Sequence, residues 1–190
     1  MSKVQKARTN CPACNYYSFG GNVHPSCKTK WGMDGHVAVW RYQGIVRSGV
    51  HAMKYRFAYD VISEFVEHLA SFKFQNAILV PIPLHKQRQN WRGFNQSSLL
   101  AKEISKKFNL TCVESALIRI ENTTPQAHLG KEERLQNIRG KFAVKEPFSL
   151  INKQIVLIDD VWTTGSTMKE CAKVLKKAGA KEVWGWTLAS

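Results

Sequence analysis

The sequence lacks several features that would assign it to common protein classes. No apolar run approaches the roughly 18 residues of a membrane-spanning helix, and the start, MSKVQKARTN, has no apolar stretch of signal-peptide length. Neither the GxxxxGK[ST] loop of nucleoside triphosphatases nor the GxGxxG fingerprint of dinucleotide-binding proteins occurs. We therefore expect a cytoplasmic protein that does not itself span a membrane and is neither a triphosphatase nor a dinucleotide-dependent enzyme.

Acidic residues are scarce, with 14 Asp and Glu against 28 Lys and Arg and a formal net charge of +14. A surface this basic attracts polyanions before any specific contact forms. Nucleic acid, polyphosphate and anionic membrane surfaces all fit the charge. An inert basic surface is the alternative, because charge imbalance alone is a weak functional signal.

The cysteines are few and unevenly placed. There are five, and an odd number without an export signal argues against a disulfide framework. The first 27 residues contain CPAC and HPSC, a spacing typical of tetrahedral Zn²⁺ sites, although three free thiols beside a chance histidine would give the same pattern. We predict a structural zinc module over residues 1–33, held by Cys11, Cys14, His24 and Cys27.

The remainder, residues 34–190, alternates strand-like and helical patterns. Alternation of this kind predicts an α/β fold with a mostly parallel sheet and helices on both faces. Ligands of such folds lie beyond the carboxyl ends of the strands. We expect helices at 59–72, 95–108 and 166–178, and strands at 77–81, 154–158 and 183–188.

The stretch IVLIDDVWTTGST, Ile155 to Thr167, follows such a strand with two acids and a hydroxyl-rich turn. Free backbone N–H groups, hydroxyls and one glycine at a helix start form a cradle for a phosphate. Asp159 and Asp160 can accept the hydroxyls of a sugar and help to hold a hydrated Mg²⁺. The predicted ligand is a ribose 5-phosphate. Its phosphate would be held by Thr163, Thr164, Gly165, Ser166 and Thr167. The alternative is an ordinary turn in which the acids only cap a helix.

This stretch resembles the phosphoribosyl pyrophosphate (PRPP) signature of type I phosphoribosyltransferases. Two further segments, VPIPLHKQRQNWRGFNQSSLLA (80–101) and RIENTTPQAHLGKEERLQNIRGKF (119–142), are similar to segments of the ComF (ComFC) competence family and its GntX-like relatives. With the metal module, the resemblance covers nearly all of the chain. Relatives generally have a second Cys-x-x-Cys where this chain has His24.

The resemblance implies roles for several basic residues. The first segment would be a loop on the pyrophosphate side, and the alternative for it is a solvated basic loop. The second segment would be a flexible catalytic loop, and the alternative for it is an ordinary surface loop. The implied reaction breaks the C1–pyrophosphate bond with Mg²⁺ present. The pyrophosphate-side residues would be His85, Lys86, Arg88 and Arg92, and the catalytic residues Asp159, Asp160, Arg119 and Arg134.

Basic and aromatic residues also interleave after the metal module. Exposed rings beside phosphate-seeking cations suit single-stranded DNA, whose bases are free to stack, although such rings are as readily part of the core. The predicted DNA-binding residues are Arg41, Arg47, Lys54, Tyr55 and Arg56.

Three functions are consistent with this sequence. The resemblance implies a PRPP-binding protein that handles incoming single-stranded DNA in natural transformation, with a DNA-translocation helicase or membrane-channel protein as partner at the inner face of the membrane. The alternatives are a metabolic phosphoribosyltransferase with a small nitrogenous acceptor, and a protein that binds PRPP only as a regulatory ligand. The net charge of +14 favours the first function, and no residue set that would recognise the acceptor is visible.

Overall fold

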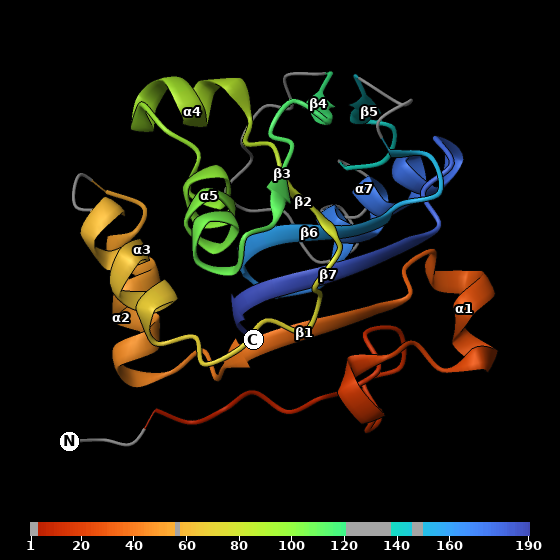
Figure 1. The fold of residues 1–190 in the computed structure, drawn as a ribbon, viewed down its shortest axis with the longest axis horizontal. Coiled ribbons are helices and arrows are strands. Elements are labelled where there is room, and N and C mark those ends of the chain that lie inside the picture. The colour runs from red at the N-terminus through yellow and green to blue at the C-terminus, as the bar shows by residue number, and fades with distance from the viewer. Residues whose placement is uncertain (1–3, 56–57, 121–137, 146–149) are drawn as a thin grey trace.

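The computed structural model describes residues 4–55, 58–120, 138–145 and 150–190 (Figure 1). Within these residues a five-stranded sheet has the order β1-β7-β6-β2-β3, and every neighbouring pair in it is parallel. A separate antiparallel pair joins β4 to β5. The strands are β1 (Gly35–Trp40), β2 (Ile78–Pro81), β3 (Thr111–Cys112), β4 (Leu117–Arg119), β5 (Phe142–Val144), β6 (Gln154–Val161) and β7 (Glu182–Ala189).

The sheet is covered on both faces. Helices α2, α3 and α5 lie on one side of it and α7 on the other, where the β4–β5 pair packs as well (Figure 1). Because side chains alternate along a strand, the two faces of β6 contribute to two hydrophobic cores. Val156 and Ile158 face the core shared with α2, α3 and α5, and Ile155 and Leu157 face the core shared with α7. The helices are η1 (Phe19–Gly21), α1 (Pro25–Trp31), α2 (Gly44–Ala52), α3 (Ala58–Glu67), α4 (Lys86–Arg92), α5 (Gln96–Phe108) and α7 (Ser166–Lys177).

The predicted fold class is confirmed, and the later elements form where expected, with one correction. Strand β6 continues three residues beyond the predicted end at Ile158, because its pairing with β7 extends to Val161, so Asp159 and Asp160 lie within the strand and not after it. Helices α5 and α7 begin and end within one residue of the predicted limits, and Gly179 follows α7 with a φ of 93°. Helix α3 is shorter than predicted, because it ends at Glu67 and not at Phe72. Phe72 nevertheless lies in the core, with its ring stacked on Phe108 at a centroid distance of 5.6 Å.

The segment after β2 differs from the expected loop. It forms helix α4, which begins after His85, whose Nδ1 accepts a hydrogen bond from the N–H of Gln87 at 3.2 Å. The helix ends at Gly93, which has a φ of 78° and donates its N–H to Gln89. Local capping at both ends therefore makes a helix of a segment whose composition suggested a basic loop.

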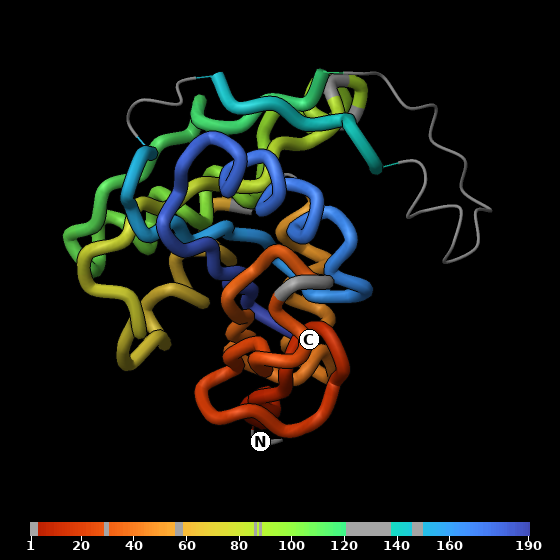
Figure 2. The backbone as a smooth tube through the Cα atoms, turned by 90° about the vertical axis from the view of Figure 1, so that its right-hand side faces the viewer, coloured from red at the N-terminus to blue at the C-terminus, as the bar shows by residue number. Residues whose placement is uncertain are grey.

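The N-terminal residues run beside β1 at one edge of the sheet. In the view of Figure 2 the N-terminal segment lies at the bottom of the molecule, away from the β4–β5 pair at the top. The N–H of Ala7 donates to the carbonyl of Val39 at 3.0 Å, and that of Arg41 to Gln5 at 2.9 Å. These bonds connect the predicted metal module to the strand nearest it. The division of the chain into domains at residue 33 stays a prediction.

Among the described residues, no helix combines the length and the apolar character needed to cross a bilayer.

Candidate functional site

The turn between β6 and α7 has the geometry of a small anion cradle. Gly165 has a φ of 70°, which favours glycine, and a Cβ built on it would overlap the indole ring of Trp162. The hydroxyls of Thr164 and Ser166 lie 2.6 Å apart and hydrogen-bond to each other. A small hollow of about 40 Å³ is lined by Asp159 and by all five turn residues from Thr163 to Thr167. The first N–H groups of α7 face the same turn, so an anion here gains from the helix dipole.

The two acids precede the turn and lie in different surroundings. Asp159 Oδ1 accepts hydrogen bonds from the Ser97 hydroxyl at 2.8 Å and from the Asp160 N–H at 2.9 Å. Burial and the neighbouring Asp160 carboxylate raise the pKa of Asp159 to about 7. Asp160 is buried, and its Oδ1 accepts the Val161 N–H at 2.8 Å. Its Oδ2 has no hydrogen-bond partner among the described residues.

An unpaired buried carboxylate oxygen is costly unless a ligand completes it. A sugar hydroxyl could donate to it, and oxygen donors of this kind also suit a hydrated Mg²⁺. Asp159 and Asp160 therefore fit both the ribose and the hydrated Mg²⁺ that the sequence predicts.

The predicted pyrophosphate-side residues lie after the neighbouring strand. Strand β2 is parallel to β6, so both carboxyl ends reach the same edge of the sheet, and the N–H of Ile82 donates to Ile158 at 3.0 Å. His85 is buried there and caps α4. Arg92, at the end of α4, donates from Nη1 to Gln96 Oε1 at 3.2 Å. The side chains of Lys86 and Arg88 lie outside the described part of the structure.

The structure describes one of the two predicted catalytic arginines, Arg119, and not the other. Arg119 ends β4, and its guanidinium lies over the ring of Phe142 on β5, 5.5 Å from the centroid. Strand β5 contacts α7, so this arginine is positioned close to the helix that follows the phosphate turn. Arg134 lies outside the described residues.

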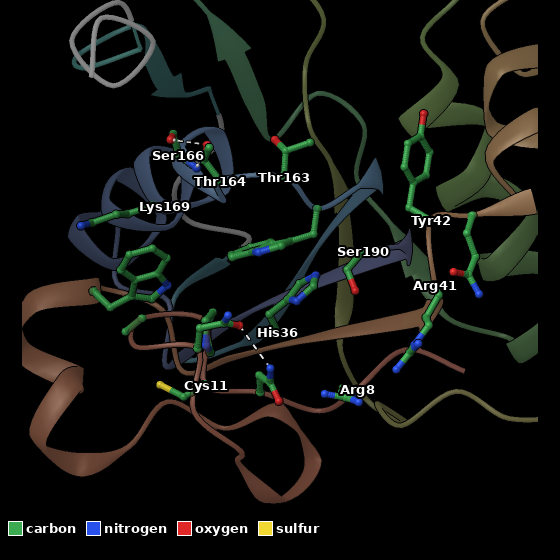
Figure 3. Close-up of a pocket in the computed structure, with 17 residues that line it drawn as sticks. Arg8, Cys11, His36, Arg41, Tyr42, Thr163, Thr164, Ser166, Lys169 and Ser190 are labelled. Carbon is green, nitrogen blue, oxygen red and sulfur yellow. Dashed lines mark hydrogen bonds between the residues drawn. The ribbon is translucent and has the colours of Figure 1, made fainter. Parts of the chain in front are cut away.

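A cavity of about 760 Å³ adjoins the turn on the side of the N-terminal residues (Figure 3). The sequence does not predict this cavity, because its wall combines residues from four separate parts of the chain, 8–15, 31–43, 162–169 and 190. Trp162, which stands inside the quoted motif, was the one signal that could have pointed to it. The wall of the cavity includes Arg8, Trp31, His36, Arg41, Trp162 and Lys169.

The four predicted metal ligands lie together. The donor atoms of Cys11, Cys14, His24 and Cys27 are all within 4.8 Å of one another, so the cluster can hold a metal ion. Cys14 Sγ lies 3.3 Å from His24 Nδ1, and His24 Nε2 lies 3.1 Å from the Tyr17 carbonyl. Donation of the Nε2 proton to that carbonyl leaves Nδ1 as the ligand atom. Burial opposes ionisation of the Cys11 thiol, but the N–H groups of His24, Cys14 and Ala13 outweigh it and lower the pKa to about 7.

The predicted DNA-binding residues are only partly brought together. Arg47 and Tyr55, both exposed, line one shallow surface hollow beside α2. Arg41 lies instead in the wall of the large cavity, and Lys54 is partly buried. Arg56 lies outside the described residues.

Comparison with known proteins gives consistent results. Residues 95–189 match the family described as the phosphoribosyl transferase domain. The chain is 35% identical over 114 residues to competence protein F of Haemophilus influenzae, covering 58% of this chain and 49% of that protein. It is 32% identical over 157 residues to competence protein ComFC of Bacillus subtilis, covering 80% of this chain and 62% of that protein. The chain thus spans about half to three fifths of the length of these relatives.

A solved structure with a similar fold is glutamine phosphoribosylpyrophosphate amidotransferase from B. subtilis. It is 18% identical with a TM-score of 0.43, and the similarity covers 71% of this chain and 26% of that one.

Proposed function

Because the chain belongs to the phosphoribosyl transferase domain family, as a protein of the ComF type, we propose that it binds PRPP together with Mg²⁺. The 5-phosphate would lie in the turn formed by Thr163, Thr164, Gly165, Ser166 and Thr167. Asp159 and Asp160 would hold the ribose hydroxyls.

Asp160 Oδ2, for which the described part of the chain provides no hydrogen-bond partner, carries this proposal. It is buried beside a turn that offers hydroxyl and N–H donors to a phosphate. A ligand with an anionic group at one end and donating hydroxyls nearby would satisfy both features, and a phosphorylated ribose has them.

The same arrangement supports a phosphoribosyl transfer. The bond between C1 and the pyrophosphate oxygen would break, the electron pair would leave with pyrophosphate, and a nitrogen of the acceptor would bond to C1 and lose its proton. When bound, Mg²⁺ would stabilise charge on the leaving group. The cations proposed to meet that charge are Lys86, Arg88, Arg92, Arg119 and Arg134. His85, whose Nδ1 accepts the Gln87 N–H, would take part as a neutral donor through Nε2.

Calorimetry with PRPP and MgCl₂ tests the site. The Asp160→Ala variant should bind PRPP at least about 10-fold more weakly, because a hydrogen bond to a charged group contributes roughly 1.5–3 kcal/mol. Asp60→Ala, which removes an exposed carboxylate on α3, is the matched control and should bind as the wild type does. Equal affinities for the two variants would show that PRPP binds elsewhere.

We further propose that the protein acts in natural transformation by binding single-stranded DNA in the cytoplasm. Its relatives include proteins named for competence and for DNA utilization. The net charge of +14 supplies attraction for a polyanion. Arg47 and Tyr55 share one exposed hollow, so a phosphate and a base of the same strand could contact them together. A helicase or membrane-channel partner would bring the strand to this surface.

Fluorescence anisotropy with labelled oligonucleotides tests DNA binding. Single strands should bind more tightly than the matching duplex, with an affinity that falls steeply with salt. Arg47→Ala should weaken binding and reduce the salt dependence, whereas Lys153→Ala, an exposed cation at the amino end of β6, should change both much less. No binding at low salt, or equal binding of the duplex, would contradict the proposal.

The large cavity supports a second candidate function. A cavity of about 760 Å³ next to the phosphate turn is within the size range of small-molecule sites, roughly 300–1,000 Å³. A metabolic phosphoribosyltransferase with a small nitrogenous acceptor would use such a space. Detection of pyrophosphate release with PRPP and a small acceptor, but not with DNA, would favour this candidate.

In either case we propose that the Cys3His cluster holds a structural Zn²⁺. Four protein ligands leave no position for a substrate, which is typical of structural zinc.

A further inference from the structure

An apolar groove of about 680 Å³ runs along α2 and α3, which lie side by side (Figure 1). Among the described residues, none lines both this groove and either the phosphate turn or the large cavity. The groove is therefore separate from the site that the proposed function assigns to PRPP.

Two aromatic rings form part of the groove wall. The ring of Trp40, at the end of β1, lies 5.3 Å from the ring of Phe65 on α3, measured between centroids. Helices α2 and α3 approach closely at Gly49, where a Cβ would lie 2.6 Å from the Phe65 ring. Contacts between β1, α2 and α3 thus form the groove without the help of a partner.

Large apolar side chains are exposed along the same groove. Ile45 at the start of α2 is 66% exposed and Val4 is 48% exposed, and both line the groove. Single exposed apolar residues are ordinary on a protein surface, but here two of them adjoin the partly exposed rings of Trp40 and Phe65. A continuous patch of this kind is stabilised when another molecule covers it.

Helix α3 presents one face to the groove. Val61 and Phe65 are four residues apart and supply apolar wall. Asp60, Glu64 and His68 repeat at the same interval and are exposed, so they form the edge of the groove. A helix rises about 1.5 Å per residue, so this face is roughly 10–12 Å long, which is the length of two helical turns.

The charge of this edge is opposite to that of the whole protein. The described lining residues include Asp60 and Glu64 but no lysine or arginine, in a chain with 28 Lys and Arg against 14 Asp and Glu. Of these lining residues only His68 can carry a positive charge, and its Nε2 lies 2.9 Å from Glu64 Oε1. Arg41 lines an adjoining hollow of about 290 Å³ at the start of α2. The groove itself therefore suits an apolar occupant with positive charges, and repels the phosphates of nucleic acid.

We propose that this groove binds an amphipathic helix of a partner protein, with apolar side chains in the groove and lysines or arginines beside Asp60 and Glu64. Such helices bind in grooves of this kind through side chains at positions i, i+4 and i+7, which extend over two turns. That length matches the face of α3. The inference goes beyond the binding of PRPP and of DNA and depends on neither.

Two peptides of about 20 residues test the charge of the occupant. They share one pattern of leucines at helical spacing and differ at the polar positions, which are all lysine in one and all glutamate in the other. Anisotropy of each labelled peptide is measured with the full chain at about 0.15 M salt, which screens distant charges. We expect the lysine peptide to bind at least about 10-fold more tightly. The net charge of +14 alone would give the reverse order.

Two pairs of variants test the position of the site. Ile45→Ser should weaken the lysine peptide about 10-fold, whereas Ile151→Ser, which removes an exposed isoleucine outside the groove, should not. Glu64→Gln should weaken the same peptide about 3-fold, whereas Glu67→Gln, which removes an exposed carboxylate of α3 outside the groove, should have much less effect. All four side chains are exposed, so the thermal melts should match that of the wild type.

Several results would overturn the inference. If neither peptide binds, the groove accepts no helix of this kind, and equal or tighter binding of the glutamate peptide would remove the charge complementarity. Equal effects of the two isoleucine variants would place the peptide elsewhere on the surface. A dimer in analytical ultracentrifugation that Ile45→Ser dissociates would identify a second copy of this chain as the occupant, in place of a partner helix.

Discussion

The imidazole of His36 and the indole of Trp162 stack with their centroids 4.0 Å apart, although 126 positions separate them in the sequence. The contact joins β1 at the edge of the sheet to the turn that follows β6. Stacked aromatic pairs contribute roughly 0.5–1.5 kcal/mol beyond the area they bury. The shape of the phosphate turn therefore depends on β1 as well as on its own residues.

Gly165 should tolerate no side chain, for two separate reasons. Its φ of 70° disfavours other residues, and a Cβ would overlap the Trp162 ring. We expect Gly165→Ala to lower the free energy of unfolding by roughly 2–4 kcal/mol and to abolish measurable PRPP binding. Chemical denaturation and calorimetry measure the two effects.

Gly140→Ala separates the two reasons. Gly140 has a φ of 71°, but no atom of the described residues lies within 4 Å of a Cβ built on it, so this variant should show only the backbone cost, roughly 1–2 kcal/mol. An equal loss of stability in both variants would mean that the Trp162 ring moves away without cost.

Thr187→Val tests the tautomer of His36. The Thr187 hydroxyl donates its single proton to the Ala189 carbonyl at 3.1 Å, so the 3.0 Å contact between His36 and Thr187 requires a proton on His36 Nε2. The substitution preserves the shape of a fully buried side chain but leaves the His36 Nε2 proton without its acceptor. We expect a loss of roughly 1–3 kcal/mol in the free energy of unfolding. Thr111→Val, on the exposed surface of β3, is the control and should change stability little. If both variants are equally stable, the hydrogen bond contributes nothing.

Much of the fold was predictable because its signals are local. The apolar run of β6, the helical spacing of α7 and the glycine after it each lie within a few residues, and the structure confirms them. The metal ligands were predictable for the same reason, since paired spacing predicts proximity. Helix α4 was missed because its capping bonds come from single residues, His85 and Gly93, that periodicity does not detect.

The large cavity could not be predicted, because it exists only once distant strands pair. His36 reaches Thr187 because β1 lies beside β7, a register that no local pattern specifies. Trp31 and Lys169 meet across the same edge. Residues such as these look like ordinary core and surface positions until the sheet order is known.

Zinc should be present at about one equivalent per purified chain, and removing a ligand should release it. Cys14→Ser should lose most of the metal and unfold at a lower temperature, because a module of this size gains its stability from the ion. Cys112→Ser, which removes a thiol outside the cluster, should retain both the zinc and the melting temperature of the wild type. Elemental analysis and thermal melts provide the measurements, and full zinc occupancy in Cys14→Ser would contradict the assignment.

Asp159 should make the protein less stable as the pH rises. Burial and the Asp160 carboxylate raise its pKa to about 7 from an ordinary value of 3.8, so the folded chain holds this proton more tightly than the unfolded chain. Between these two values the unfolded chain has lost the proton and the folded chain has kept it. The contribution of Asp159 to the free energy of unfolding is therefore complete below about pH 4 and lost as the pH rises to about 7.

Asp159→Asn removes this titration and leaves an amide oxygen that can still accept from Ser97. The variant should thus gain stability relative to the wild type as the pH rises from 4 to 7 and keep a constant advantage above that. His36 acts in the opposite direction, since its lowered pKa weakens the fold in acid, but the wild type and the variant share that effect. Denaturant midpoints of both proteins at each pH give the difference directly. A difference that stays the same from pH 4 to 8 would show that Asp159 does not hold its proton in the folded chain, and the proposed ribose contact would then begin from an ionised carboxylate.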